Sequence, residues 1–170
     1  MRIEKKIAFV VMGVSGVGKT TIGQMLATAT GLPFFDGDDF HPQANIDKMA
    51  VGVPLTDADR QGWLLQLHQL LQAQLQLQGC VIACSALKQQ YRDVLSSGLG
   101  DAMVFVYLQG SYEEVWQRLQ QRTGHFMQAS LLQSQFDALE PPTDAITVAI
   151  TNTPEAIVKA ILLQVATKFI

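Results

Sequence analysis

The chain has 170 residues, of which 48 % are hydrophobic and 16 % charged, and its net charge at pH 7 is -3. This length suits one well-filled domain over residues 1–170 and is short for two. The negative charge gives no general attraction to nucleic acid or to an anionic membrane, so we expect neither as a partner. No apolar run approaches the roughly 18 residues that span a bilayer.

The first predicted element is a buried strand at residues 7–12, and a glycine-rich loop follows it directly. Residues 13–20 read GVSGVGKT and match the pattern G-x-x-x-x-G-K-[ST]. A strand that ends in such a loop and leads into a helix directs backbone N–H groups at an anion, at the positive end of the helix dipole. We therefore expect nucleoside triphosphate binding, and not a glycine turn without a ligand.

Each residue type in this loop has a role in that prediction. The glycines let the backbone approach phosphate oxygens without an intervening Cβ. Lys19 supplies a mobile positive charge for the outer phosphates, and the Thr20 hydroxyl is a ligand for Mg²⁺. The predicted nucleotide-binding residues are Gly13, Val14, Ser15, Gly16, Val17, Gly18, Lys19, Thr20 and Thr21.

A weaker strand at residues 33–35 leads into the sequence DGDD at residues 36–39. Ligands bind at the carboxyl ends of strands in open α/β sheets. Of two carboxylates two residues apart, Asp36 and Asp38, one can support Mg²⁺ through water while the other accepts the proton of an attacking hydroxyl. The alternative is an acidic turn whose aspartates cap a helix.

The rest of the chain alternates predicted helices with apolar strands. Strands are expected at residues 81–85, 103–108 and 145–150, and helices at residues 20–30, 56–78, 87–96, 111–121 and 154–166. Nearly continuous apolar strands separated by helices indicate a parallel sheet covered on both faces. We therefore predict a three-layer α/β/α domain with a five-stranded parallel sheet.

The two cysteines, Cys80 and Cys84, lie on one apolar strand without a second Cys or His pair at metal-ligand spacing. They are expected to be buried free thiols, which suits a reducing compartment. The basic and apolar start of the chain could pass for a secretory signal, but the strand before the phosphate loop explains it better. We therefore predict a cytoplasmic protein.

Arginines are scarce, and most of them follow the phosphate loop. Arg60 closes GVPLTDADR, Arg92 stands near Lys88 in SALKQQYR, and Arg118 and Arg122 lie four residues apart. Arginine pairs bidentately with carboxylate and phosphate, so these positions suggest an anionic acceptor and a cationic clamp on the transferred group. A solvated surface arginine is the alternative at each position.

Phosphate loops occur in GTPase switches, motor ATPases and small-molecule kinases. The guanine-reading N-K-x-D or T-K-x-D of a GTPase is missing from the sequence. Motor ATPases place an acidic residue at the end of a strong apolar strand, whereas the strand at residues 81–85 ends in Ser85. These differences favour a kinase of a small metabolite.

Three segments resemble the gluconate kinase (gluconokinase) family: FFDGDDFHPQANIDKMAVGVPLTDADRQGWL, CSALKQQYRDVL and GHFMQASLLQSQFDALEPP. With the phosphate loop they cover most of residues 13–142. The resemblance implies ATP-dependent phosphorylation of D-gluconate at its 6-hydroxyl. It further implies a nucleoside-monophosphate-kinase-like fold, a mobile lid at about residues 118–140, and a homodimer.

The resemblance also implies roles for the acidic and basic residues. Asp38 would activate the acceptor hydroxyl and Asp36 would lie nearer the Mg²⁺. Arg118 and Arg122 would be lid arginines that act on the transferred group, with His125 on the segment that closes over ATP. The implied catalytic residues are Lys19, Asp38, Arg118 and Arg122, and the implied gluconate ligands are Asp38, His41, Arg60, Lys88 and Arg92.

The sequence departs from the family pattern in two places. Val17 and Thr20 stand where the family often has serine, and Gly62 stands where proline is frequent. A threonine hydroxyl can still bind Mg²⁺, so only the start of the helix around Gly62 is put in doubt. Two alternatives stay open: another small-acid kinase such as a shikimate kinase, and a regulatory module that binds ATP without catalysis.

Overall fold

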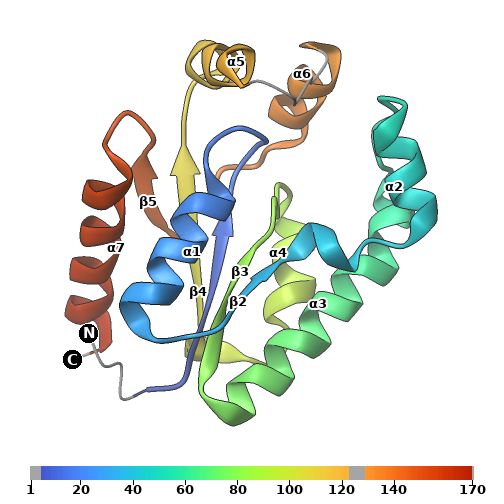
Figure 1. Ribbon diagram of the computed structural model, residues 1–170. Helices are drawn as coiled ribbons and strands as arrows, with labels where there is room; N and C mark the ends of the chain where they lie inside the picture. Colours follow the sequence, from blue (N-terminus) through green and yellow to red (C-terminus); the bar gives the residue numbers. More distant parts are fainter. Residues whose placement is uncertain (1–4, 123–128, 170) are drawn as a thin grey trace.

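The computed structural model describes residues 5–122 and 129–169, so His125 lies outside the described residues. Its centre is a five-stranded sheet in the order β2-β3-β1-β4-β5, in which all neighbouring strands are parallel (Figure 1). The predicted fold class is confirmed. The strands are β1 (Ile7–Met12), β2 (Phe34–Asp36), β3 (Gly79–Ala83), β4 (Met103–Gln109) and β5 (Ile146–Ala149).

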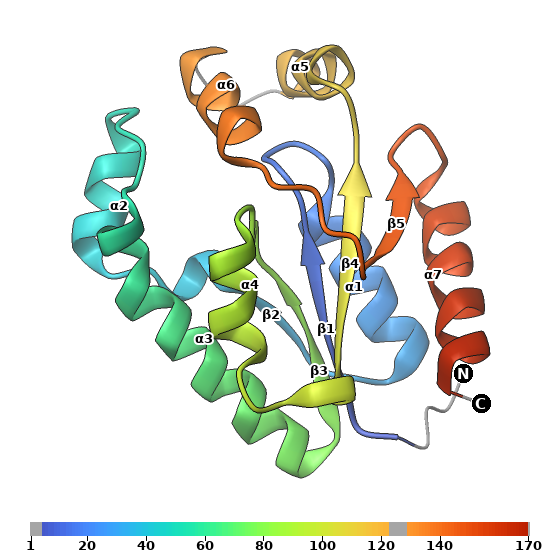
Figure 2. The ribbon, with the colours of Figure 1, turned by 180° about the vertical axis from the view of Figure 1, so that it is seen from behind.

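Helices cover both faces of the sheet and its carboxyl end (Figures 1 and 2). The helices are α1 (Lys19–Thr30), α2 (Gln43–Ala50), α3 (Asp57–Leu77), α4 (Gln89–Ser96), α5 (Tyr112–Gln121), α6 (Ala129–Ala138) and α7 (Pro154–Phe169). Two short 3₁₀ helices are η1 (Gly37–Phe40) and η2 (Gly100–Ala102). None of the helices in the described ranges is long and apolar enough to cross a membrane.

The alternation of side chains along β1 divides the core into two layers. Ile7, Phe9 and Val11 belong to a cluster that α1 and α7 complete. Ala8 and Val10 point the other way, into a cluster with the buried faces of α3 and α4. Because every β1 side chain is buried, the strand is apolar throughout, as parallel strands with both faces covered require.

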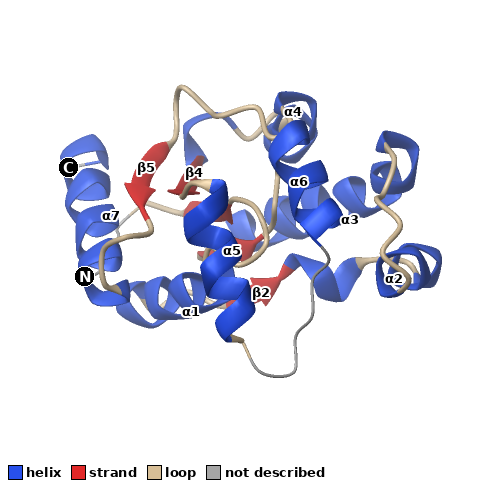
Figure 3. Cartoon of the chain, turned by 90° about the horizontal axis from the view of Figure 1, so that it is seen from above, coloured by secondary structure: helices blue, strands red, loops and turns tan. Residues whose placement is uncertain are grey.

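The carboxyl edge of the sheet carries two helices that the sequence analysis did not predict, α2 and α6. Seen from above, α5 lies over the sheet with α6 beside it, while α2 stands apart beyond the start of α3 (Figure 3). The phosphate loop and the acidic turn of η1 open at the same edge. This edge therefore gathers most of the predicted site residues.

Candidate active site

The phosphate loop joins β1 to α1 and is held by contacts within itself. The side chains of Val14 and Val17 are buried beneath it. Lys19 Nζ donates hydrogen bonds of 3.0 Å to the carbonyl oxygens of Gly13 and Val14. Helix α1 begins after Gly18 without a side-chain cap, so its first N–H groups remain available to an anion.

Gly16 in this loop is required by a neighbouring helix as well as by the turn. Its φ is +87°, in the left-handed region that disfavours other residues. A Cβ at Gly16 would also lie 2.9 Å from the Leu119 side chain and 3.3 Å from that of Val115, both on α5. The loop is therefore packed directly against α5.

The two aspartates after β2 have different surroundings. Asp36 lies near the loop, where its Oδ2 is 3.4 Å from the Thr20 hydroxyl. Its Oδ1 accepts a hydrogen bond of 3.0 Å from the Asp38 backbone N–H and caps η1. Asp36 therefore serves as a cap, the alternative considered for this turn, while it also faces Thr20.

The pair Thr20 and Asp36 fits an Mg²⁺ ion that arrives with a nucleotide. Mg²⁺ takes one or two protein oxygens and completes its shell with water and phosphate oxygens. Within residues 5–122 and 129–169, no group of three or more His, Cys, Asp or Glu side chains could hold a metal ion alone. The donor set thus suits a metal shared with a substrate.

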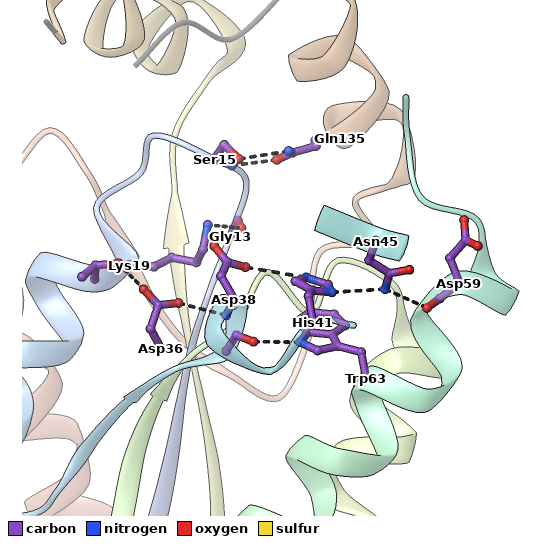
Figure 4. Close-up of polar contacts among 12 residues, drawn as sticks. Gly13, Ser15, Lys19, Asp36, Asp38, His41, Asn45, Asp59, Trp63 and Gln135 are labelled. Carbon is purple, nitrogen blue, oxygen red and sulfur yellow. Dashed lines mark hydrogen bonds and ion pairs between the residues drawn. The ribbon is translucent and has the colours of Figure 1, made fainter. Parts of the chain in front are cut away.

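Asp38 points into the space between the phosphate loop and His41, with its side chain 80 % exposed (Figure 4). Partial desolvation by the surrounding protein, and next the negative charge of Asp36, raise the pKa of Asp38 above its ordinary value, while Lys19 opposes the shift. Desolvation in turn lowers the pKa of Lys19, an effect that Asp38 partly offsets. The Asp38 carboxylate and the Lys19 ammonium group therefore influence each other's pKa.

His41 is held by contacts that fix which ring nitrogen carries its proton. Its ring stacks on Trp63, with centroids 4.1 Å apart, and Trp63 Nε1 donates to the Gly37 carbonyl oxygen at 2.7 Å. Asn45 Nδ2 lies 3.2 Å from His41 Nδ1 and donates to the Asp59 carbonyl oxygen at 2.9 Å.

Since an amide nitrogen only donates, Nδ1 of His41 is the acceptor and its proton resides on Nε2. Desolvation lowers the pKa of His41 and favours this neutral form, against the opposing effect of Asp38. Nε2 lies 3.8 Å from the Asp38 carboxylate. The ring therefore turns its N–H toward the proposed base.

Arg60 and Lys88 come together around the Tyr91 ring. The Arg60 guanidinium carbon lies 5.3 Å and Lys88 Nζ 5.7 Å from the ring centroid. Tyr91 OH donates to Asp57, which also accepts from Lys88 Nζ at 3.0 Å. These bonds, led by the one from Tyr91, lower the pKa of Asp57 to about 2.

Arg92 is buried and bonds to backbone carbonyl oxygens. It is only 2 % exposed. Its guanidinium donates to the carbonyl oxygens of Ala86, Leu87 and Glu140 at 2.7, 3.1 and 2.8 Å. Ala86 has a φ of +45°, so Arg92 supports a strained turn just before Lys88. This geometry does not support the prediction that Arg92 contacts gluconate.

Arg118 of α5 and Arg122, the residue that follows this helix, have different neighbours. Arg118 donates to the Ile150 carbonyl oxygen, in the loop after β5, and lines a 190 Å³ pocket there. Arg122 ends α5 close enough to the phosphate loop to lower the pKa of Lys19 as a minor contribution. Arg122 thus lies close enough to Lys19 for their charges to interact, whereas Arg118 is turned toward the β5–α7 loop.

Four residues of this edge were missed in the sequence analysis: Asn45, Asp57, Trp63 and Tyr91. The two aromatic residues lie among buried apolar positions of α3 and α4, where they look like core residues in the sequence. Asn45 is 3 % exposed, and its place in HPQANIDKM was the only signal available. A second cleft, of 460 Å³, adjoins His41 on the side of Gly62 and Gln66.

Comparison with known proteins assigns the chain to a family. The model of the shikimate kinase family matches residues 15–166. A gluconokinase of Gluconobacter oxydans is 51 % identical, over 79 % of this chain and 76 % of that protein. A probable gluconokinase of Mus musculus is 49 % identical, over 78 % and 82 %. The chain belongs to the gluconokinase family.

A crystal structure of a gluconokinase from Sinorhizobium meliloti extends the match to three dimensions. It has a TM-score of 0.91 and 40 % identity, and the match covers 99 % of this chain and 95 % of that one. As a gluconokinase family member the chain is an ATP-dependent kinase. We distinguish two ends of the site. The donor end is the phosphate loop (residues 13–20) together with Asp36. The acceptor end comprises Asp38, His41, Arg60, Lys88 and Tyr91.

Proposed function

We propose that this protein transfers the γ-phosphoryl group of ATP to the 6-hydroxyl of D-gluconate and forms 6-phosphogluconate. The observation that carries this proposal is the acceptor end itself. A carboxylate with a raised pKa faces the phosphate loop, and two cations meet around Tyr91 on the neighbouring helices. A sugar acid needs both features: a base for its hydroxyl and positive charge for its carboxylate.

In this mechanism Asp38 accepts the proton of the 6-hydroxyl as its oxygen attacks the γ-phosphorus. The bond from that phosphorus to the bridging oxygen of ADP breaks, and Asp38 later releases its proton to water. The raised pKa makes Asp38 a stronger base than an ordinary aspartate. His41 Nε2–H orients the carboxylate or a substrate hydroxyl.

The donor end binds and neutralises the phosphates. Loop N–H groups and Lys19 hold the outer phosphates, and Arg122 faces the same region from α5. Thr20 and Asp36 would hold the Mg²⁺, directly or through water, and this ion supplies charge neutralisation of the β- and γ-phosphates. Arg118 and the pocket beside Ile150 suit the base or ribose of the nucleotide.

Release of ADP from Mg·ATP by the purified protein tests this function. The acceptors compared are D-gluconate, its epimers, shikimate and a nucleoside monophosphate, with a reaction lacking acceptor as the baseline. Release with gluconate alone is the expected result. ADP release with shikimate alone would make shikimate the acceptor in place of gluconate. Tight ATP binding without ADP release in the presence of any acceptor would favour a regulatory module.

We also propose a cytoplasmic homodimer that contacts through α2 and the segment after it. Four apolar side chains there are exposed: Ile46 by 43 %, Met49 by 37 %, Val51 by 72 % and Val53 by 44 %. Burial of such a cluster between two copies would remove apolar surface from water. Sedimentation of the protein and of Val51→Glu tests this: a dimer that the substitution leaves intact would place the interface elsewhere.

A further inference from the structure

The phosphate loop has a contact with α6 that none of the roles above explains. Gln135 Oε1 accepts a hydrogen bond of 2.7 Å from the Ser15 backbone N–H, and Gln135 Nε2 donates to Ser15 Oγ at 3.0 Å. One side-chain amide thus pairs with the backbone N–H and the hydroxyl of Ser15 (Figure 4). The two residues are 120 positions apart in the sequence.

Packing around α6 fixes the direction of this amide. Leu132 on the same helix is fully buried, and the Phe136 ring meets Tyr112 of α5 with centroids 5.6 Å apart. Gln135 is half-buried between these anchors. Its rotamers are therefore restricted before any ligand binds, which lowers the entropic cost of the two hydrogen bonds.

The same segment of chain reaches the acceptor end. The backbone N–H of Glu140 donates to the Leu87 carbonyl oxygen at 2.8 Å, and the Glu140 carbonyl oxygen accepts from buried Arg92 at 2.8 Å. Arg92 in turn holds the carbonyl oxygens of Ala86 and Leu87, immediately before Lys88. Residues 135–140 thus contact the phosphate loop at one end and the turn that presents Lys88 at the other.

We propose that Gln135 is a positioning residue that fixes the phosphate loop for nucleotide and, through residues 135–140, couples nucleotide binding to acceptor binding. The coupling rests on the proposed function, because it needs gluconate as the acceptor. The effect of Gln135 on nucleotide affinity does not depend on the identity of the acceptor. By linkage, if bound nucleotide changes the affinity for the acceptor, then bound acceptor changes the affinity for nucleotide by the same factor.

The test compares Gln135→Leu with Gln133→Leu. Gln133 lies on the exposed side of the same helix and bonds only to Asp137, one turn away, among the described contacts. Calorimetry gives the Kd of the non-hydrolysable analogue AMPPNP with Mg²⁺, without and with saturating gluconate. Loss of two hydrogen bonds should weaken AMPPNP binding roughly tenfold in Gln135→Leu, and the Kd ratio between the two conditions should move toward one.

Gln133→Leu should stay within about twofold of the parent protein in both quantities. Equal behaviour of the two leucine variants would overturn the proposal. If gluconate is not the acceptor, no protein shows a Kd ratio different from one, but the loss of AMPPNP affinity in Gln135→Leu remains and distinguishes the two failures.

A third variant, Gln135→Glu, separates positioning from simple support of α6. The carboxylate can still accept from Ser15 N–H, but it brings negative charge to the phosphates, so AMPPNP binding should weaken further than in Gln135→Leu and recover as the pH falls. A purely structural role predicts instead a lower melting temperature with an unchanged pH dependence of binding. That result would also refute the proposal, even if Gln135→Leu does not fold.

Discussion

The donor and acceptor ends share one edge of the sheet, but they are built from different parts of the chain. The donor end is mostly backbone from one continuous loop, fixed by glycine conformations and by two hydrogen bonds from Lys19 to loop carbonyls. The acceptor end consists of side chains in or next to η1, α3 and α4, joined by long-range contacts such as Lys88 to Asp57. The conformation of the first comes mainly from local sequence, to which Gln135 and α5 add tertiary support, whereas the second is assembled by tertiary packing.

The largest expected effect comes from the acceptor end. Asp38→Asn removes the base and should lower kcat by roughly 10²- to 10⁴-fold while AMPPNP binding changes little. Asp39→Asn, at the exposed neighbouring carboxylate, is the control and should keep kcat near the parent value. Steady-state kinetics with saturating substrates measures both, and a near-normal kcat in Asp38→Asn would remove Asp38 from this role.

The pH profile gives a second view of the same residue. Activity requires the ionised carboxylate, and the pKa of Asp38 is raised by desolvation and by Asp36. We therefore expect kcat/KM to fall with decreasing pH at a higher pH than an ordinary aspartate would give, and this acid limb should be absent from the residual activity of Asp38→Asn. A limb that persists unchanged in the variant would assign it to another group.

At the donor end, Gly16→Ala should weaken nucleotide binding through the backbone. The left-handed φ costs a residue with a Cβ roughly 1–2 kcal/mol, and the new methyl group meets Leu119 at 2.9 Å. We expect KM for ATP to rise about tenfold or more, with a lower melting temperature and a smaller change in KM for gluconate. A variant that loses gluconate affinity first would contradict the division into two ends.

A smaller effect is expected for Tyr91→Phe, and it should act on gluconate binding and not on ATP binding. The substitution keeps the ring between Arg60 and Lys88 but removes the hydroxyl that joins Asp57 to Arg60. KM for gluconate should rise by roughly three- to tenfold, with KM for ATP unchanged. Equal changes in both constants would mean that the network supports the whole edge and not the acceptor end alone.

The smallest effect should be a gain in stability. Gly62 lies on the exposed surface of α3, and a Cβ there would meet no atom within 4 Å among the described residues. Gly62→Ala should therefore raise the free energy of unfolding by about 0.5–1 kcal/mol through helix propensity. Chemical denaturation measures this change, and a rise in KM for gluconate would instead show that the cleft beside His41 takes part in acceptor binding.

The same contrast explains what could be predicted from the sequence. The strands, the loop and the acidic turn depend on neighbouring residues, so their patterns identify them. Arg60 and Arg92 look alike in the sequence, and only the fold shows that one faces the acceptor end while the other is buried against carbonyl oxygens. Gln135 gave no signal, because its partner is distant in the chain and it lies in an ordinary polar pattern.

The helices α2 and α6 were missed for a related reason. Each is 8 to 10 residues long and has few buried positions, so its hydrophobic periodicity is weak. Their stability comes from particular tertiary contacts, such as Asn45 with Asp59 and Phe136 with Tyr112. The resemblance marked both segments as important without giving their conformation.

The lengths of the strands have a consequence for the behaviour of the protein under stress. The two edge strands, β2 and β5, have three and four residues, whereas the inner strands have five to seven. Unpaired edges can recruit other chains into intermolecular sheets, and very short edges offer little to pair with. The folded protein should therefore resist aggregation at its sheet edges. Aggregation on heating should begin only with global unfolding.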